Sequence, residues 1–213
     1  MKITIREPGN ALTHLIACIM ALIGMAPLLI KASSNHHIFA MSIFACSMIA
    51  LYAASTIYHS VVVPDKQLKI FKKIDHFMIF ILIAGSYTPI CLITLPKPMG
   101  YYLLAIVWSV ALIGILIKAF WIMCPKWFSS IIYIAMGWLC VLVFGSLWNE
   151  LPLAAFNWLL VGGIIYTVGG IIYALKLPLF NSIHKSFGSH AIFHLFVMGG
   201  SFCHYIFMYN YIA

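Results

Sequence analysis

Apolar and polar positions follow one another along this chain in long blocks. Seven apolar runs, separated by short polar connections, cover residues 11–30, 37–63, 74–95, 100–121, 127–148, 153–175 and 189–211. A helix needs about 20 residues to cross the hydrocarbon core of a bilayer, so each run is long enough to span it with some tilt. The pattern therefore predicts an all-α fold, a seven-transmembrane helix bundle that forms a single integral membrane domain over residues 1–213.

Composition supports this prediction and excludes other classes of protein. Hydrophobic residues make up 64% of the chain and charged residues only 8%, whereas about 25% of residues in soluble domains are charged. The net charge of +8 lies in the connections and forms no basic stripe, which argues against nucleic-acid binding. The six cysteines are scattered without a CxxC motif, so we expect no disulfide framework.

The positions of lysine and arginine predict how the bundle is inserted. Most lie in the N-terminal tail, near the end of the fourth run, or in the connections after the second, fourth and sixth runs: Lys2, Arg6, Lys66, Lys69, Lys72, Lys73, Lys118, Lys126, Lys176 and Lys185. The opposite connections contain only Lys31 and Lys97. By the positive-inside rule, the N-terminus is cytoplasmic and the C-terminus is outside.

Two histidines in the last apolar run are candidates for metal binding. His190 and His194 are four residues apart, so they lie on one face of a helix, one turn apart. That spacing suits chelation of one ion, and imidazole is a common zinc ligand. Because polar residues inside a membrane span are costly, this pair requires a partner or a function.

Topology places two further metal-competent side chains at the same depth. His59 ends the second run and Asp75 begins the third, both next to the side of the membrane where the seventh run begins. Three histidines around zinc leave the fourth position open for water, as in catalytic zinc sites, and zinc lowers the pKa of that water to about 7. We therefore expect zinc to be bound by His59, His190 and His194.

Asp75 and Ser55 are the expected catalytic residues. Asp75 would orient the water, accept its proton and return the proton to a leaving group. Direct ligation of zinc by Asp75 is an alternative, and an aspartate at a helix start is also typical of a helix cap. Ser55 lies one turn before His59 and would donate a hydrogen bond to a substrate carbonyl oxygen or a metal-bound oxygen.

Three other histidines have open roles. His14, early in the first run, either supports the site, lines its entrance, or makes hydrogen bonds at the helix end. His76 follows Asp75 but should point about 100° away from it on a helix. His204 lies roughly 21 Å along the helix axis from His190, so it cannot bind the same ion but could line the same cavity.

Several motifs together resemble a known family. They are Glu7-Pro8-Gly9-Asn10 with Thr13-His14, Ser55-Thr56-Ile57-Tyr58-His59, Asp75-His76, Gly85-Ser86-Tyr87-Thr88-Pro89, His190-Ala191-Ile192-Phe193-His194, and Gly200-Ser201 with His204. Nearly end to end, the chain resembles the hemolysin III family of bacterial membrane proteins, which is grouped with progestin and adipoQ receptors and alkaline ceramidases.

The resemblance implies a multi-pass protein of the bacterial inner (plasma) membrane with a cytoplasmic N-terminus. It also implies zinc held by His59, His190 and His194, Asp75 near the metal-bound water, and Ser55 as a site residue. The first functional hypothesis is a zinc-dependent hydrolase of a lipid amide or ester that affects membrane lipid homeostasis.

Two other functions are alternatives. The first is a membrane sensor or receptor in which zinc is structural and a membrane lipid is the ligand. The second is a cytolytic, hemolysin-like protein, although no run carries the continuous polar stripe of a pore. The sequence does not predict the oligomeric state.

Overall fold

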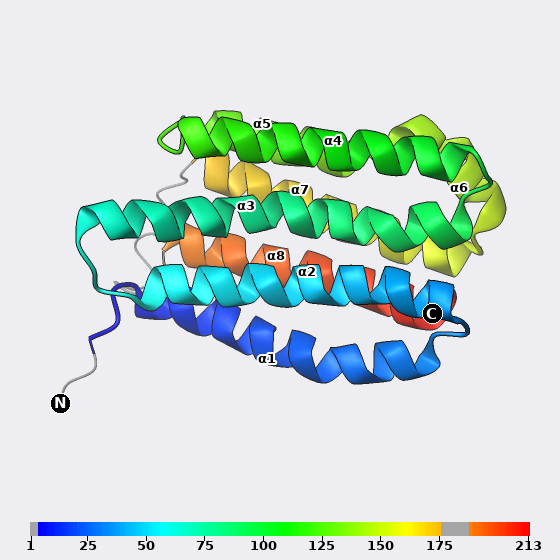
Figure 1. The fold of residues 1–213 in the computed structure, drawn as a ribbon, viewed down its shortest axis with the longest axis horizontal. Coiled ribbons are helices and arrows are strands. Elements are labelled where there is room, and N and C mark those ends of the chain that lie inside the picture. The colour runs from blue at the N-terminus through cyan, green and yellow to red at the C-terminus, as the bar shows by residue number, and fades with distance from the viewer. Residues whose placement is uncertain (1–3, 176–187) are drawn as a thin grey trace.

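A computed structural model describes residues 4–175 and 188–213, and its regular elements there are all helices (Figure 1). The helices are α1 (Pro8–Lys31), α2 (Asn35–Ser60), α3 (Asp65–Pro89), η1 (Ile90–Thr94), α4 (Met99–Phe120), α5 (Lys126–Gly137), η2 (Trp138–Val143), α6 (Phe144–Glu150), α7 (Leu153–Leu175), α8 (Ser189–Phe207) and η4 (Met208–Ile212). All six cysteines are free, as predicted.

These elements combine into seven membrane-spanning segments within the described residues. α3 continues into η1, α5 continues through η2 into α6, and α8 continues into η4. Seven segments are long and apolar enough to cross a bilayer. This confirms the predicted all-α, seven-helix fold, and the chain is a multi-pass membrane protein.

Helix α3 begins well before the apolar run that predicted it. The run starts at residue 74, whereas the helix starts at Asp65 and includes four lysines in an exposed or half-buried extension. Lysine and glutamine favour helix even outside the apolar region, which explains the longer helix. Asp75 therefore lies roughly three turns into α3, and the alternative in which it caps the helix is wrong because Pro64 occupies that position.

The fifth span is broken in the middle. α5 ends at Gly137, and a tighter 3-10 segment, η2, precedes α6. Tyr87 on α3 compensates for the break, because its hydroxyl donates to the Gly137 carbonyl at 2.6 Å and accepts from the Cys140 N–H at 2.8 Å. A break in a spanning helix is tolerated where a neighbouring side chain satisfies the freed backbone groups.

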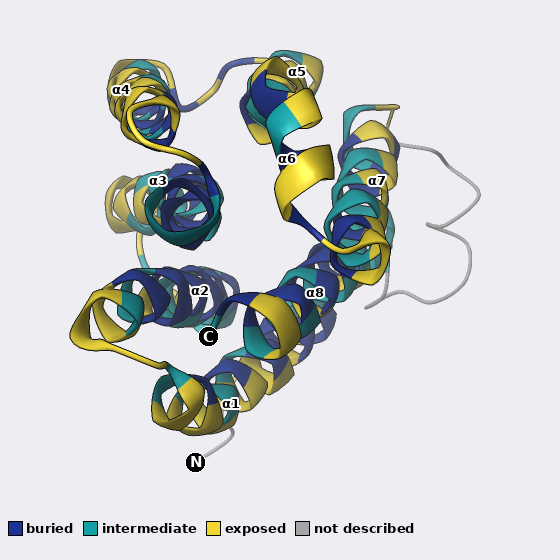
Figure 2. Ribbon diagram, turned by 90° about the vertical axis from the view of Figure 1, so that its right-hand side faces the viewer, coloured by how far each residue is buried: buried dark blue, intermediate teal, exposed yellow. Residues whose placement is uncertain are grey.

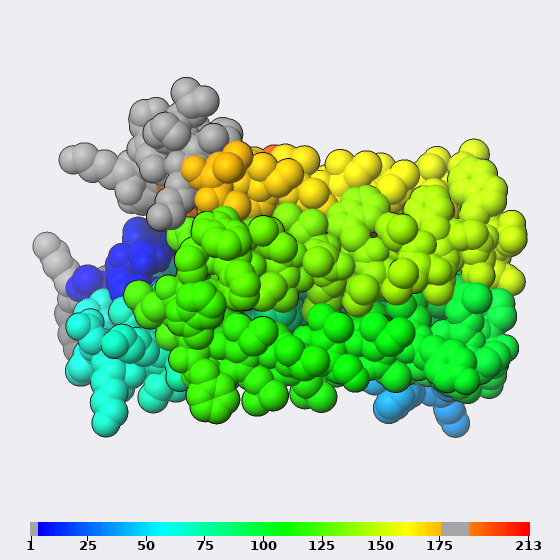
Figure 3. Space-filling model, turned by 90° about the horizontal axis from the view of Figure 1, so that it is seen from above, coloured from blue at the N-terminus to red at the C-terminus, as the bar shows by residue number. Residues whose placement is uncertain are grey.

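The spanning segments form a ring when viewed along the bundle (Figure 2). α1, α2, α3 and α4 follow one another along one side, and α5, α7 and α8 complete the ring until α8 meets α1. α4, α5 and α7 share one outer face (Figure 3). Large hydrophobic side chains are exposed on the outside of the ring, including Leu12, Ile23, Leu112 and Ile164, as expected of a surface that faces lipid.

Candidate metal centre

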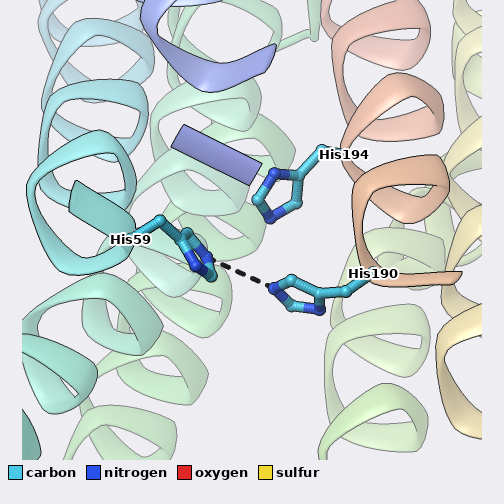
Figure 4. A group of neighbouring side chains, drawn as sticks. All are labelled: His59, His190 and His194. Atoms are coloured by element: carbon cyan, nitrogen blue, oxygen red, sulfur yellow. Dashed lines mark hydrogen bonds between the residues drawn. The ribbon is translucent and has the colours of Figure 1, made fainter. Parts of the chain in front are cut away.

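Three histidines meet at the end of the bundle where α1 begins (Figure 4). His59 comes from the last turn of α2, and His190 and His194 come from the first two turns of α8. One possible ligand atom from each lies within 4.8 Å of the others. His59 and His194 are buried, at 1% and 2% exposure, and His190 is half-buried. The ring brings side chains of α8 within reach of side chains of α2, which the sequence does not specify.

The spacing of this histidine cluster fits a metal ion. The Nε2 atoms of His59 and His190 are 3.3 Å apart. Two nitrogens bound at 2.0–2.1 Å to a tetrahedral zinc ion would lie about 3.3–3.4 Å from each other. The three ring centroids are 4.6 to 5.1 Å apart, so no imidazole is left out of the cluster. The cluster therefore could hold a metal ion.

Glu7 fixes which nitrogen of His59 is available to a metal. The Nδ1 of His59 donates to the Glu7 Oε2 at 2.5 Å, because a carboxylate can only accept. The lone pair of His59 is then on Nε2, which faces His190. A carboxylate behind a ligand histidine is a common arrangement in metal sites, where it orients the ring and raises its basicity.

Glu7 is itself held firmly in this position. Arg6 lies 3.0 Å from the Oε1 of Glu7. The side chain of Asn10 donates at 2.8 Å to Oε2, the oxygen that also accepts from His59. The backbone N–H of Glu7 donates to the His59 carbonyl at 3.0 Å, so the start of α1 is tied to the end of α2. The hydrogen bond from His59, with smaller contributions from Asn10 and Arg6, outweighs partial burial and lowers the pKa of Glu7 to about 2.

Thr13 fixes which nitrogen of His194 is available to a metal, as Glu7 does for His59. The Thr13 hydroxyl donates to the Asn10 carbonyl at 2.8 Å, so it accepts from the Nδ1 of His194 at 3.1 Å. The lone pair of His194 is therefore also on Nε2. Two of the three histidines thus have their outer nitrogen bound to a residue of α1 or its N-cap, which leaves the other nitrogen for a ligand.

Asp75 and Ser55 lie beside the cluster. Both are buried, and both line the cavity onto which His190 and His194 open. The Asp75 carboxylate interacts with the Ser55 hydroxyl and electrostatically with His59. The side chain of His76 still reaches Asp75, although the two positions diverge on the helix: its Nδ1 lies 3.5 Å from Asp75 Oδ2 while donating to the Lys72 carbonyl at 2.8 Å.

His14 is packed against the cluster without a hydrogen bond. Its ring stacks on His194 with 3.6 Å between centroids and 13° between planes, and it meets Tyr52 edge-on at 5.0 Å. Neither nitrogen of His14 has a hydrogen-bond partner among the described residues. The helix-end alternative for His14 is therefore wrong, and the residue lines the same cavity as Asp75.

The cavity beside the cluster is large and mostly apolar. It offers about 140 Å³ to water-sized molecules and is walled by residues of α1, α2, α3, α5, η2, α7 and α8. Near the cluster the wall contains Ser130 and Tyr133 of α5, whose hydroxyls have no hydrogen-bond partner among the described residues. Further away it contains leucine, isoleucine and valine side chains. The cluster is thus one polar end of a hydrophobic chamber.

The structure brings His59, His190 and His194 together, and Asp75 and Ser55 line the cavity beside them. The sequence predicts one depth for the three histidines and Asp75, with Ser55 one turn before His59. It did not identify the partners Glu7 and Thr13, nor the stacking of His14. Glu7 to His14 were visible as one of the family motifs, but nothing in the spacing shows that this segment contacts α2 and α8. Lys185, Lys176 and His184, which the sequence places in the last connection, lie outside the described residues.

Comparison with known proteins supports a common architecture. The family described as haemolysin-III related matches residues 3–205. The chain is 42% identical over 199 residues to Hemolysin-3 of Bacillus cereus, covering 92% of this chain and 86% of that protein. It is 40% identical over 202 residues to a Hemolysin-3 homolog of Bacillus subtilis (strain 168), covering 93% and 91%.

A more distant relative has a different name. The adiponectin receptor protein of Drosophila melanogaster is 25% identical over 218 residues, which cover 93% of this chain and 49% of that protein. The described residues form seven apolar helices and a three-histidine cluster. With a family match over nearly its whole length, this chain belongs to the haemolysin III family of multi-pass membrane proteins.

Proposed function

We propose that this protein is a zinc-dependent hydrolase of a lipid amide or ester in the bacterial inner membrane. The observation that carries the proposal is the position of the histidine cluster at the polar end of an apolar cavity, with Asp75 and Ser55 in the same wall. A lipid headgroup would reach the cluster while its acyl chain occupies the rest of the cavity. The excess of basic residues supports a cytoplasmic location for this end of the bundle.

The donor set favours zinc among the metals. Imidazole nitrogens suit zinc, three histidines with an open fourth position are typical of its catalytic sites, and the 3.3 Å separation of two donors fits its bond lengths. When bound, zinc lowers the pKa of a coordinated water to about 7 and so supplies a nucleophile at neutral pH.

The remaining steps belong to side chains of this chain. Asp75 is placed to accept a proton at a carboxylate oxygen and to return it to the leaving nitrogen or oxygen when the acyl C–N or C–O bond breaks. When substrate binds, the Ser55 hydroxyl would turn from Asp75 and donate its hydrogen bond to the acyl carbonyl oxygen as that oxygen gains negative charge. The apolar wall would exclude bulk water from the acyl chain, which strengthens both interactions.

A receptor with a structural metal is the alternative that the relative named adiponectin receptor protein suggests. A structural zinc site is closed by four protein ligands. Here three histidines gather beside a cavity lined by unpaired hydroxyl and imidazole groups, which favours chemistry on a bound ligand.

The test is to measure metal content and lipid turnover in the same preparations. Purified wild type should contain zinc by elemental mass spectrometry and should release fatty acid from co-purified or added bacterial lipids. Asp75→Asn should keep zinc and lose turnover by about 100-fold or more, the size of a general acid–base contribution. Asp65→Asn, at the exposed start of α3, is the matched control and should change neither. Full turnover by zinc-free protein would overturn the proposal.

A further inference from the structure

The cavity extends from the histidine cluster deep into the bundle, as far as His204. His204 is the last residue of α8 in its wall, ten residues after His194, so it lies roughly 15 Å from His194 along the helix axis. A smaller hollow between α3, α5, α6 and α7 shares His204, Trp138 and Gly163 with this cavity. The cavity therefore has an imidazole at each end.

His204 has a buried nitrogen without a partner. Its Nε2 makes no hydrogen bond to any described residue, although the ring interacts with the Leu159 carbonyl and meets the Tyr166 ring edge-on at 5.4 Å. More than nine in ten buried polar groups find a hydrogen-bond partner, so an unpaired one in a cavity wall points to a ligand.

Neighbouring hydroxyl groups do not satisfy this nitrogen because they are paired with each other. The Tyr52 hydroxyl donates to the Ser201 Oγ at 2.6 Å, and the Tyr166 hydroxyl shares a hydrogen bond with the same Ser201 Oγ at 2.7 Å. Ser201 is one turn before His204 on α8, yet its oxygen is already engaged twice. Among the described residues, the Nε2 of His204 is therefore a buried polar atom of this region that has no hydrogen bond.

The position of the His204 ring depends on a glycine of the facing helix. A Cβ atom at Gly162 on α7 would collide with the imidazole of His204, whereas a Cβ atom at Gly163 would lie in ordinary contact, 3.9 Å from Trp138. The sequence predicts both glycines only as close-packing positions. The structure shows that Gly162 makes room for the imidazole beside the cavity.

The surroundings select a neutral ligand group. Apart from Asp75 and the histidines, no charged side chain lines the described wall, so a charged group beside His204 would lack a counter-ion and would be costly to bury. The distance of roughly 15 Å from the cluster is half of the hydrocarbon thickness of about 30 Å, which is the reach of one acyl chain. A hydroxyl group carried by such a chain could donate to or accept from the imidazole.

We propose that His204 binds a hydroxyl group near the far end of the acyl chain whose carboxyl end lies at the histidine cluster. The preferred lipids would then be those with oxygenated chains. This inference rests on the proposed function insofar as a lipid chain occupies the cavity, but it does not depend on turnover.

Three fatty acids of equal length test the proposal: lauric acid, ω-hydroxylauric acid and α-hydroxylauric acid. Each resembles a hydrolysis product and cannot turn over, and each is measured by displacement of radiolabelled laurate from the full-length protein in detergent. Wild type should bind ω-hydroxylaurate at least as tightly as laurate. In His204→Phe, affinity for ω-hydroxylaurate relative to laurate should fall about tenfold, because the buried hydroxyl loses its partner.

Three further variants test whether the preference for the ω-hydroxyl chain depends on a hydrogen bond to His204. His204→Gln retains a hydrogen-bonding group and should restore the preference for the ω-hydroxyl chain. Gly162→Ala should reduce this preference by displacing the ring, whereas Gly163→Ala should not. All variants should retain metal, since the cluster is about 15 Å away.

The proposal is overturned if wild type and His204→Phe bind the acids in the same ratio, which would leave only water beside His204. It is also overturned if His204→Phe lowers the relative affinity for α-hydroxylaurate as much as that for ω-hydroxylaurate. Binding of none of the three acids by wild type would overturn it as well. Absence of lipid hydrolysis or of zinc would count against the proposed function and leave this ratio unaffected.

Discussion

The two ends of the cavity hold their histidines in different ways. At the metal centre, the outer nitrogens of His59 and His194 are bound by Glu7 and Thr13, so each ring presents a fixed lone pair to the cluster. At the opposite end, His204 has room made by Gly162 but no partner for its Nε2. A ligand imidazole requires a fixed tautomer, whereas an imidazole that contacts a ligand must keep a nitrogen unpaired. The difference separates a metal-binding role from a ligand-recognition role for the same residue type.

The largest effect should come from removing a member of the cluster. His194→Ala leaves two imidazoles, and we expect metal affinity to fall by more than about 100-fold, since even outer partners contribute 10–100-fold. Competition with a chelator, followed by elemental analysis, measures the loss. His36→Ala, at the exposed start of α2, is the control and should bind metal like wild type. Equal metal content in both variants would show that the cluster is not the metal site.

A smaller effect is expected from the carboxylate behind His59. Glu7→Gln keeps the shape but removes the charge that holds the Nδ1 proton, so metal affinity should fall about 10–100-fold. The same competition experiment applies. Glu150→Gln makes the same change at the exposed end of α6 and should have no effect. If the two glutamates behaved alike, the contact with His59 would be structural only.

Thr13 should contribute less than Glu7 because it is uncharged. Thr13→Val removes the acceptor for His194 and should weaken metal binding by about tenfold, while Thr13→Ser should restore it. Laurate binding to metal-loaded Thr13→Val should stay unchanged. A defect that serine does not rescue would point to lost packing of the threonine methyl group.

At the opposite end, Tyr166→Phe should leave the metal centre untouched. It removes one hydrogen bond to Ser201, which keeps Tyr52 as a partner, and should lower the free energy of unfolding by about 0.5–1.5 kcal/mol. Thermal unfolding in detergent measures this change, and metal content is measured beside it. A loss of metal in this variant would mean that the two ends of the cavity are coupled and do not act independently.

Much of the fold could be predicted because the membrane restricts the possible structures. Blocks of apolar residues in a chain with 8% charge permit little except spanning helices, and the seven predicted runs all correspond to helices. Their ends were harder to predict. α3 continues into a lysine-rich extension that hydropathy does not report, and the break at Trp138 depends on the Tyr87 hydroxyl of another helix.

The candidate site was predictable only in part, for a related reason. The depth of His59, Asp75, His190 and His194 follows from their places within apolar runs. The sequence does not show which nitrogen of His59 or His194 faces inward, because that depends on Glu7 and Thr13. These two residues belong to α1 or its N-cap, not to the helices of the histidines that they orient. His76 shows the same limit: helical geometry points its position away from Asp75, yet the flexible side chains meet at 3.5 Å.

The sequence by itself determined the spanning helices, the depth of the polar residues and the spacing of His190 and His194, since all of these are properties of one helix in a bilayer. Only the tertiary structure decided that α1 and its N-cap supply the partners of the cluster, that His14 stacks on His194, and that Gly162 makes room for His204 beside the cavity. These contacts depend on the order and rotation of helices around the ring, which side-chain packing between helices sets and hydropathy along a single helix does not record.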